Sequence, residues 1–266
     1  MDLQLNGKVA LIAGGSRGIG KAIALQLAAE GCDIVLAARD KARLDAAAAE
    51  IASKTGRKVI GISVDTGDDA SVKAMGEQAL AAMGKVDILI NAAAEPGGYA
   101  PVPALADVKG EFVDAEINIK VKGHIRCAQA VVPSMKANGW GRIVNISGLA
   151  ARQTGNIVGS LRNVAVSSLS KNLADELGPS GINVTCVHPG TTFTERTMPA
   201  VEERAKRQNS TPEELLKRMA DGNSIKHIVT AEEVASVVAF LCSPLSIAIN
   251  GDTIAAGGGV PRAIYY

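Results

Sequence analysis

The first residues that could do chemistry form a glycine-rich turn. Residues 13–20 have the sequence Ala-Gly-Gly-Ser-Arg-Gly-Ile-Gly. They lie where an apolar run ends and a helical pattern begins, so the glycines permit a tight turn and the first backbone N–H groups of the helix can approach a phosphate. A glycine cluster alone is weak evidence, but one between a strand and a helix is typical of dinucleotide binding. We therefore expect a diphosphate to bind at this turn.

Short apolar segments alternate with helical patterns along the whole chain. The segments expected to form strands are 9–13, 34–38, 59–64, 86–91, 142–147, 183–188 and 252–256. The segments expected to form helices are 19–30, 41–54, 70–83, 111–138, 158–177 and 231–243. Nearly continuous apolar strands indicate a parallel sheet that is covered on both faces.

This alternation predicts an α/β fold with one Rossmann-type, doubly wound parallel sheet and helices on both faces. Residues 1–266 are enough for one such nucleotide-binding domain, and no linker or repeat divides them. Segment 191–226 is charged and has no strand pattern. We expect it to form a helical lid over the substrate.

Composition limits the classes of partner and site. A formal net charge of +1 gives no reason to expect nucleic-acid or membrane-surface binding. The four cysteines have no metal-ligand spacing, so we expect buried free thiols and no metal. The first residues lack the pattern of a signal peptide, and no apolar run approaches the roughly 20 residues of a membrane span. These features favour a cytoplasmic protein.

Four motifs together resemble the short-chain dehydrogenase/reductase family over essentially the whole chain. They are Gly14-x-x-x-Gly18-x-Gly20, Asp65-Thr66 after the third strand, Asn91-Ala92-Ala93-Ala94, and Pro189-Gly190-x-x-x-Thr194. The third differs from the family's Asn-Asn-Ala-Gly at two positions. The resemblance implies an oxidoreductase for a carbonyl or alcohol substrate and a homo-oligomer, either a dimer or a tetramer. The cofactor contacts that it implies are Gly14, Ser16, Arg17, Gly18, Ile19, Gly20, Asp65, Thr66, Asn91, Ala92, Ala93, Pro189, Gly190, Thr192 and Thr194.

The end of the second strand favours NADP(H) over NAD(H). An acidic residue there would bind the ribose hydroxyls and repel a 2′-phosphate, but Ala38 is neutral and Arg39 follows it. Arg39 and Arg17 can both form charge-assisted hydrogen bonds to a phosphate. The alternative is that Arg39 is a solvated residue at the start of a helix.

The catalytic residues of the family are harder to find here. Members usually use an Asn, a Ser, a Tyr and a Lys, with the Lys four residues after the Tyr. Counting back from the end of helix 158–177 puts Gly159 at the Tyr position and Asn163 at the Lys position. The pair Ser167 and Lys171 has a similar spacing, but Lys171 lies about 12 Å further along the helix axis. We interpret Lys171 as a solvated lysine.

Lys120 falls at the position of the family's Asn when Gly123 and Pro133 anchor the register. Asn118 is the other candidate, but two residues rotate by roughly 200° around a helix, so only one of them can face the site. Our hypothesis is that Lys and Asn have exchanged places, with Lys120 reaching the cofactor ribose from the opposite helix. The alternative is a surface lysine in a site that has lost its function.

The remaining polar residues near the site leave several roles open. Ser147 can donate to a substrate carbonyl, or it can be a strand-end serine that bonds to backbone. Tyr99 can line the pocket or donate a proton, and Tyr265 and Tyr266 can reach a neighbouring subunit. His188 can act as an acid near the nicotinamide, although a buried, hydrogen-bonded histidine is commoner. Arg152 and Arg162 can bind an anionic substrate or face solvent, and we favour the second interpretation.

Three functions are compatible with these residues. The first is an NADP(H)-dependent oxidoreductase with a non-standard catalytic set of Ser147, Lys120 and Asn163. The second is a non-redox isomerase or lyase, and the third is a nucleotide-binding sensor or partner subunit without catalysis.

Overall fold

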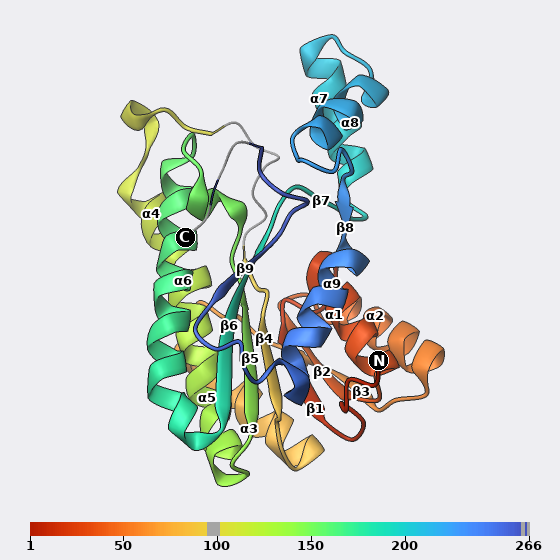
Figure 1. The fold of residues 1–266 in the computed structure, drawn as a ribbon, viewed down its shortest axis with the longest axis vertical. Coiled ribbons are helices and arrows are strands. Elements are labelled where there is room, and N and C mark those ends of the chain that lie inside the picture. Colours follow the sequence, from red (N-terminus) through yellow and green to blue (C-terminus); the bar gives the residue numbers. More distant parts are fainter. Residues whose placement is uncertain (95–101, 262–263, 265–266) are drawn as a thin grey trace.

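A seven-stranded parallel sheet forms the centre of the molecule (Figure 1). The computed structural model describes residues 1–94, 102–261 and 264. The strands lie in the order β3-β2-β1-β4-β5-β6-β9, and each neighbouring pair is parallel. The direction of strand order reverses between β1 and β4, which is where ligands bind in such sheets. The strands are β1 (Val9–Ala13), β2 (Asp33–Ala38), β3 (Val59–Ser63), β4 (Ile88–Asn91), β5 (Gly141–Ile146), β6 (Ile182–Pro189) and β9 (Thr253–Ala256).

Helices cover both faces of the sheet and bury two apolar layers. On one face lie α1 (Gly18–Ala29), α2 (Lys41–Thr55) and α9 (Ala231–Cys242). On the other face lie α3 (Asp69–Met83), α5 (Gly123–Ala137) and α6 (Ile157–Leu177). The shorter helical elements are η1 (Leu105–Asp107), α4 (Gly110–Glu116), η2 (Ile117–Lys122), η3 (Leu149–Arg152), η4 (Gly178–Ser180) and η5 (Pro244–Ser246).

The predicted fold class is confirmed, and the predicted strands are observed with ends that differ by at most two residues. All four cysteines are buried and free, as expected. Within the described part of the chain, no helix is both long and apolar enough to cross a membrane.

The helical stretch expected over 111–138 is observed, and η2 in its middle is a π-helix. Arg126 Nη1 donates to the backbone carbonyl of Asn118 at 3.1 Å and to that of Thr66 at 3.2 Å. A side chain thus supplies a partner for a carbonyl inside the widened turn, which is a recognised cause of irregular helix.

Segment 191–226 contains two helices that stand at one end of the molecule (Figure 1). They are α7 (Thr197–Gln208) and α8 (Pro212–Asp221). Two short parallel strands, β7 (Thr192–Phe193) and β8 (Val229–Thr230), lie at their base. Val201, Ala205 and Leu215 form an apolar cluster separate from the two layers of the main core. The helical character is therefore observed, and the function of a lid stays a prediction.

Candidate functional site

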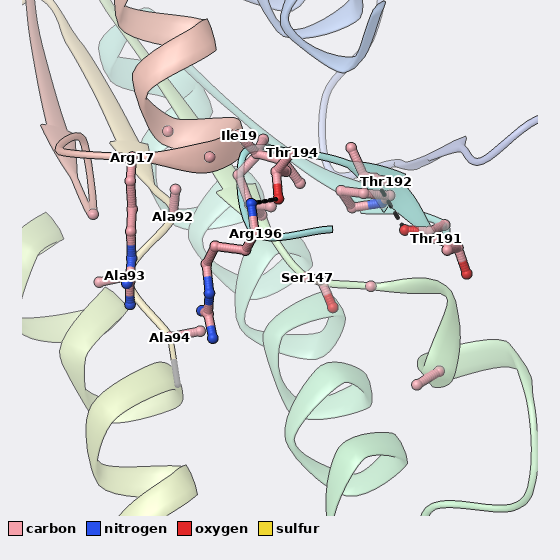
Figure 2. Close-up of a pocket in the computed structure, with 18 of the residues that line it drawn as sticks. Arg17, Ile19, Ala92, Ala93, Ala94, Ser147, Thr191, Thr192, Thr194 and Arg196 are labelled. Atoms are coloured by element: carbon pink, nitrogen blue, oxygen red, sulfur yellow. Dashed lines mark hydrogen bonds between the residues drawn. The ribbon is translucent and has the colours of Figure 1, made fainter. Parts of the chain in front are cut away.

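A cavity of about 810 Å³ opens at the carboxyl ends of the central strands. The turn between β1 and α1 lines one side of it, and Lys120, Ser147 and Asn163 line another. Residues of α7 and α8, among them Val201 and Leu215, line the same cavity. In Figure 2 the side chains of Arg17 and Arg196 extend in the same direction, and Ser147 lies on a separate segment. The fold thus brings residues from distant parts of the chain to one site.

The glycine turn is shaped by close backbone packing. Gly14 has φ +84°, and a Cβ there would lie 2.7 Å from the amide nitrogen of Ala93. A Cβ on Gly20 would lie 2.2 Å from the carbonyl oxygen of Gly14. Side chains at these two positions would push apart the turn, α1 and the end of β4. The glycines therefore bring the N-terminus of α1 to the cavity wall.

The N-terminus of α1 already binds an anionic group of the chain. The amide of Gly18 donates to the carboxylate of Glu195, with distances of 3.1 Å to Oε1 and 3.2 Å to Oε2. The positive end of the helix dipole favours such a charge. Since this carboxylate is a stand-in for a phosphate, the residues here fit a cofactor diphosphate.

Nearly all of the predicted cofactor residues lie in the wall of this cavity. They are Gly14, Ser16, Arg17, Gly18, Ile19, Gly20, Arg39, Asp65, Thr66, Ala92, Ala93, Pro189, Gly190, Thr192 and Thr194. Asn91 is the exception, because its side chain is fully buried and its Nδ2 donates to Asn145 Oδ1 at 2.9 Å. Its contacts connect β4 to β5 and do not reach the cavity.

Lys120, Asn163 and Ser147 form a buried hydrogen-bonded network in the same cavity wall. Lys120 Nζ donates to Asn163 Oδ1 at 2.7 Å and to the backbone carbonyl of Ser147 at 3.0 Å. Ser147 Oγ donates to the backbone carbonyl of Asn163 at 2.9 Å. The alternative of a surface Lys120 is wrong, since only 4% of the residue is exposed. Ser147 makes the backbone bond expected of a strand-end serine and also faces the cavity.

Lys120 is the principal charge at this end of the cavity. Burial lowers the pKa of Lys120 to about 8, so the amine is still largely protonated at neutral pH. Burial and the charge of Lys120 lower the pKa of His124 to about 3. Burial, Arg152 and Lys120 lower the pKa of His188 to about 4. Both histidines are therefore neutral at pH 7. They add no second positive charge beside the Lys120 ammonium.

The irregular turn η2 sets which side chain enters the cavity. Lys120 points to Asn163, whereas Asn118 Nδ2 donates to the carbonyl of Gly67 at 3.0 Å. Arg126 donates to Asn118 Oδ1 as well, which holds Asn118 on the far side. Lys120 and Asn118 thus lie on different sides of the turn.

Two glycines leave room for polar side chains near Lys120. A Cβ on Gly159 would lie 2.7 Å from Asn156 Cγ, and a Cβ on Gly148 would lie 3.1 Å from Asn163 Nδ2. Asn156 is the N-cap of α6, and its Oδ1 accepts a hydrogen bond from the Gly159 amide at 2.8 Å. The space beside Gly159 is therefore taken by an asparagine side chain.

Other candidates from the sequence have mainly structural contacts. Arg162 forms a largely buried ion pair with Glu116, so the expectation of a solvent-facing arginine is wrong. Arg152 Nη2 donates to the carbonyl of Thr253 at 3.1 Å. His188 Nε2 lies 2.9 Å from Ser167 Oγ and is buried, as the commoner case predicts.

Lys171 is exposed and pairs with Asp175, in agreement with its interpretation as a solvated lysine. The predictions for Tyr99, Tyr265 and Tyr266 fall on residues that lie outside the described part of the chain.

Glu195, Asn156 and Glu116 are site residues that were missed from the sequence. Asn156 carried a usable signal, because an asparagine is a preferred N-cap and the helix was expected to begin near it. Glu116 and Glu195 carried none, since each meets its partner only after folding. The partner of Glu195 is 177 residues away in the chain.

A parallel sheet with a glycine turn at its switch point defines a Rossmann-type dinucleotide-binding protein, and comparison with known proteins specifies the family. The family model described as enoyl-(acyl carrier protein) reductase matches residues 13–261. The short-chain reductase protein NovJ of Streptomyces niveus is 32% identical, over 95% of this chain and 94% of that one. The NADPH-dependent reductase BacG of Bacillus subtilis is 31% identical, over 97% and 99%.

A solved structure gives the same result. The crystal structure of L-sorbose reductase from Gluconobacter frateurii, complexed with NADPH and L-sorbose, has a TM-score of 0.92 and 31% identity, and the match covers 99% of this chain and 100% of that one. The chain belongs to the short-chain dehydrogenase/reductase family.

Proposed function

We propose that this protein is an NADP(H)-dependent oxidoreductase that interconverts a carbonyl and an alcohol. The observation that carries this proposal is the position of the Lys120 ammonium. Asn163 and Ser147 hold it in the wall of the same cavity that contains the glycine turn. Its relatives named above are reductases, and they lend no support to the isomerase, lyase or sensor alternatives.

The catalytic set differs from that of the family in this proposal. Gly159 occupies the position of the family's tyrosine, and Asn163 occupies that of its lysine. Lys120 occupies the position of the family's asparagine, so a lysine and an amide have exchanged elements. The 2.7 Å bond between Lys120 Nζ and Asn163 Oδ1 supports the exchange, because it joins the two side chains at one place.

The bound nicotinamide supplies or accepts the hydride. Lys120 stabilises negative charge that develops on the substrate oxygen and binds the ribose hydroxyls of the cofactor. Asn163 orients the ammonium through its Oδ1, and Ser147 fixes the backbone of Asn163 through its hydroxyl. A solvent proton completes the reduction, so this set works without a tyrosine.

Preference for the phosphorylated cofactor rests on two arginines. Arg17 and Arg39 both line the cavity, and Ala38 at the end of β2 brings no negative charge. BacG is named as NADPH-dependent and the L-sorbose reductase structure contains NADPH. A 7α-hydroxysteroid dehydrogenase of 29% identity contains NADH instead, so the test below compares both cofactors.

The lid and the assembly complete the proposal. Helices α7 and α8 close over the substrate, because Val201, Leu215 and Met219 line the cavity from that side. We also propose a homo-oligomer, a dimer or tetramer. Exposed Ile157, Leu161 and Val164 follow each other on α6, and an apolar stripe of this kind favours a subunit contact. Light scattering on purified protein measures the oligomeric state directly.

The cofactor assignment is tested by thermal unfolding with NADPH, NADP⁺, NADH and NAD⁺. A ligand at a hundred times its Kd stabilises the folded state by about 2.7 kcal/mol. We expect the phosphorylated pair to stabilise more than the other pair, and Arg39→Ala to reduce that difference. Lys41→Ala is the matched control, because it removes a nearby exposed charge outside the cavity wall. No stabilisation by any nucleotide would contradict the proposal.

The reaction is tested by the loss of NADPH absorbance with a panel of ketones, aldehydes and keto sugars. We expect turnover with at least one of them. A protein that binds NADPH but reduces no carbonyl, and oxidises no alcohol with NADP⁺, would overturn the assignment as an oxidoreductase.

A further inference from the structure

Glu195 supplies a negative charge to the start of α1 from a distant part of the chain. It lies between β7 and α7, and its two carboxylate oxygens accept from the Gly18 amide at 3.1 and 3.2 Å. Helix α1 has no acidic residue in its own first turn. Among the described residues, Glu195 is therefore the carboxylate that meets this helix end.

The neighbouring contacts hold Glu195 in this position. The Thr194 amide donates to Thr197 Oγ1 at 2.9 Å, and the Arg196 amide lies 3.4 Å from Thr194 Oγ1 (Figure 2). The first bond connects Thr194 to the first residue of α7, and the second joins the two residues on either side of Glu195. A group held within the same chain has a high effective concentration at its site. The carboxylate thus competes well with any anion from solution.

A cofactor diphosphate needs the same helix end. The glycine turn and the N-terminus of α1 are the parts of the cavity that suit a diphosphate, and Gly18 and Glu195 both line that cavity. Two negative charges about 4 Å apart repel each other even at an exposed contact such as this one. The carboxylate and the diphosphate therefore cannot both occupy this place at low cost.

We propose that Glu195 is an internal competitor of the cofactor and lowers the affinity for NADP(H) by occupying Gly18 in the free protein. This inference rests on the proposed cofactor site. Glu195 leaves the Gly18 amide when the diphosphate binds. The residue thus sets how tightly the cofactor is held and favours its release after each turnover.

The test is the Kd for NADPH of Glu195→Ala and Glu195→Gln, measured by calorimetry. We expect Glu195→Ala to bind about tenfold more tightly than the wild type, which is about 1.4 kcal/mol. Glu195→Gln should fall between them, because its amide oxygen can still accept from Gly18 but carries no charge. Glu202→Gln is the matched control, since it makes the same charge change on an exposed part of α7.

A second ligand separates the diphosphate effect from a general change in charge. Adenosine 2′-monophosphate lacks the diphosphate, so its affinity should be the same in all four proteins. Equal or weaker NADPH binding by Glu195→Ala would overturn the inference while leaving the proposed function intact. If the wild type and every variant failed to bind NADPH and NADH, the proposed function would fall and the inference with it.

A crystal structure with NADPH gives an independent readout. The inference requires the Glu195 carboxylate to lie beyond hydrogen-bonding distance of the Gly18 amide when the cofactor is bound. A carboxylate that still accepts from Gly18 beside a bound diphosphate would overturn it.

Discussion

The two ends of the cavity hold their functional atoms in different ways. At the proposed cofactor end the backbone itself would be the binding group, and glycines at 14 and 20 are required by contacts shorter than a side chain allows. At the catalytic end three side chains from η2, the end of β5 and α6 form a buried network. The shape of the glycine turn depends on having glycine at fixed positions. The catalytic network depends instead on where the side-chain atoms of Lys120, Ser147 and Asn163 come together.

In our proposal this difference explains why the family's glycine turn is kept at one end while the catalytic residues change at the other. A backbone site cannot exchange its glycines, because any side chain would collide with neighbouring main chain. A side-chain network can exchange two members between facing elements if the ammonium and the amide still arrive at one point. The following predictions test that contrast.

The largest effect is expected for Gly14→Ala at the cofactor end. The new Cβ would collide with the backbone of Ala92 and Ala93, and we expect NADPH affinity to fall at least a hundredfold. Gly56→Ala is the control, because Gly56 has a similar positive φ of +70° but nothing within 4 Å of its Cβ position. It should cost about 1 kcal/mol of folding free energy and leave NADPH binding unchanged. Equal losses of binding in both would show that strain, rather than contact, governs the turn.

The proposed exchange of Lys120 and Asn163 is tested by moving the two residues back. Lys120→Asn alone removes the ammonium, and Lys120→Ala does the same, so we expect NADPH affinity or kcat/KM to fall at least tenfold in each. Asn163→Lys alone places two cations together and should also be harmful. The double variant restores one ammonium and one amide, so it should be better than either single variant. A double-mutant cycle measures this coupling, and additive losses would argue against the exchange.

The smallest effect is a pH dependence that comes from Lys120. Because burial lowers its pKa to about 8, the ammonium is present below that pH and is lost as the pH rises through it. We expect kcat/KM for carbonyl reduction to fall about threefold between pH 7.5 and 8.5. Lys120→Arg keeps its charge across this pH range. Its kcat/KM should therefore not change between pH 7.5 and 8.5, even if the value is lower than that of the wild type. Identical profiles for the two proteins would assign the titration to another group.

The sequence was sufficient to predict the sheet and the glycine turn that lines the cavity. The strands are mostly apolar and the turn at Gly14 requires glycine, so both can be recognised from the local sequence. Counting from Gly123 and from the end of α6 was enough to place Lys120 and Asn163 near each other. Within a regular helix, counting residues from a known position gives the face on which a side chain lies.

Other features depend on partners that the local sequence does not contain. In the π-helical turn η2, the carbonyl of Asn118 accepts a hydrogen bond from Arg126. The same arginine donates to the carbonyl of Thr66, which lies on another loop. Asn91 is withdrawn from the cavity because Asn145 on the next strand takes its amide. The contact of Glu195 with Gly18 forms only when the lid segment returns to the first turn of the fold.

The separate apolar cluster of the lid has a consequence for how this protein can change. Val201, Ala205 and Leu215 pack with one another and with Leu216 and Met219, rather than with the layers beside the sheet. Substitutions there can therefore alter the shape of the cavity while the Rossmann core keeps its packing. Two short strands that pair with each other, β7 and β8, lie at the base of this unit. The proposed lid therefore predicts that substrate range can diverge among descendants, or be redesigned by transplanting α7 and α8, while the proposed nucleotide site stays the same.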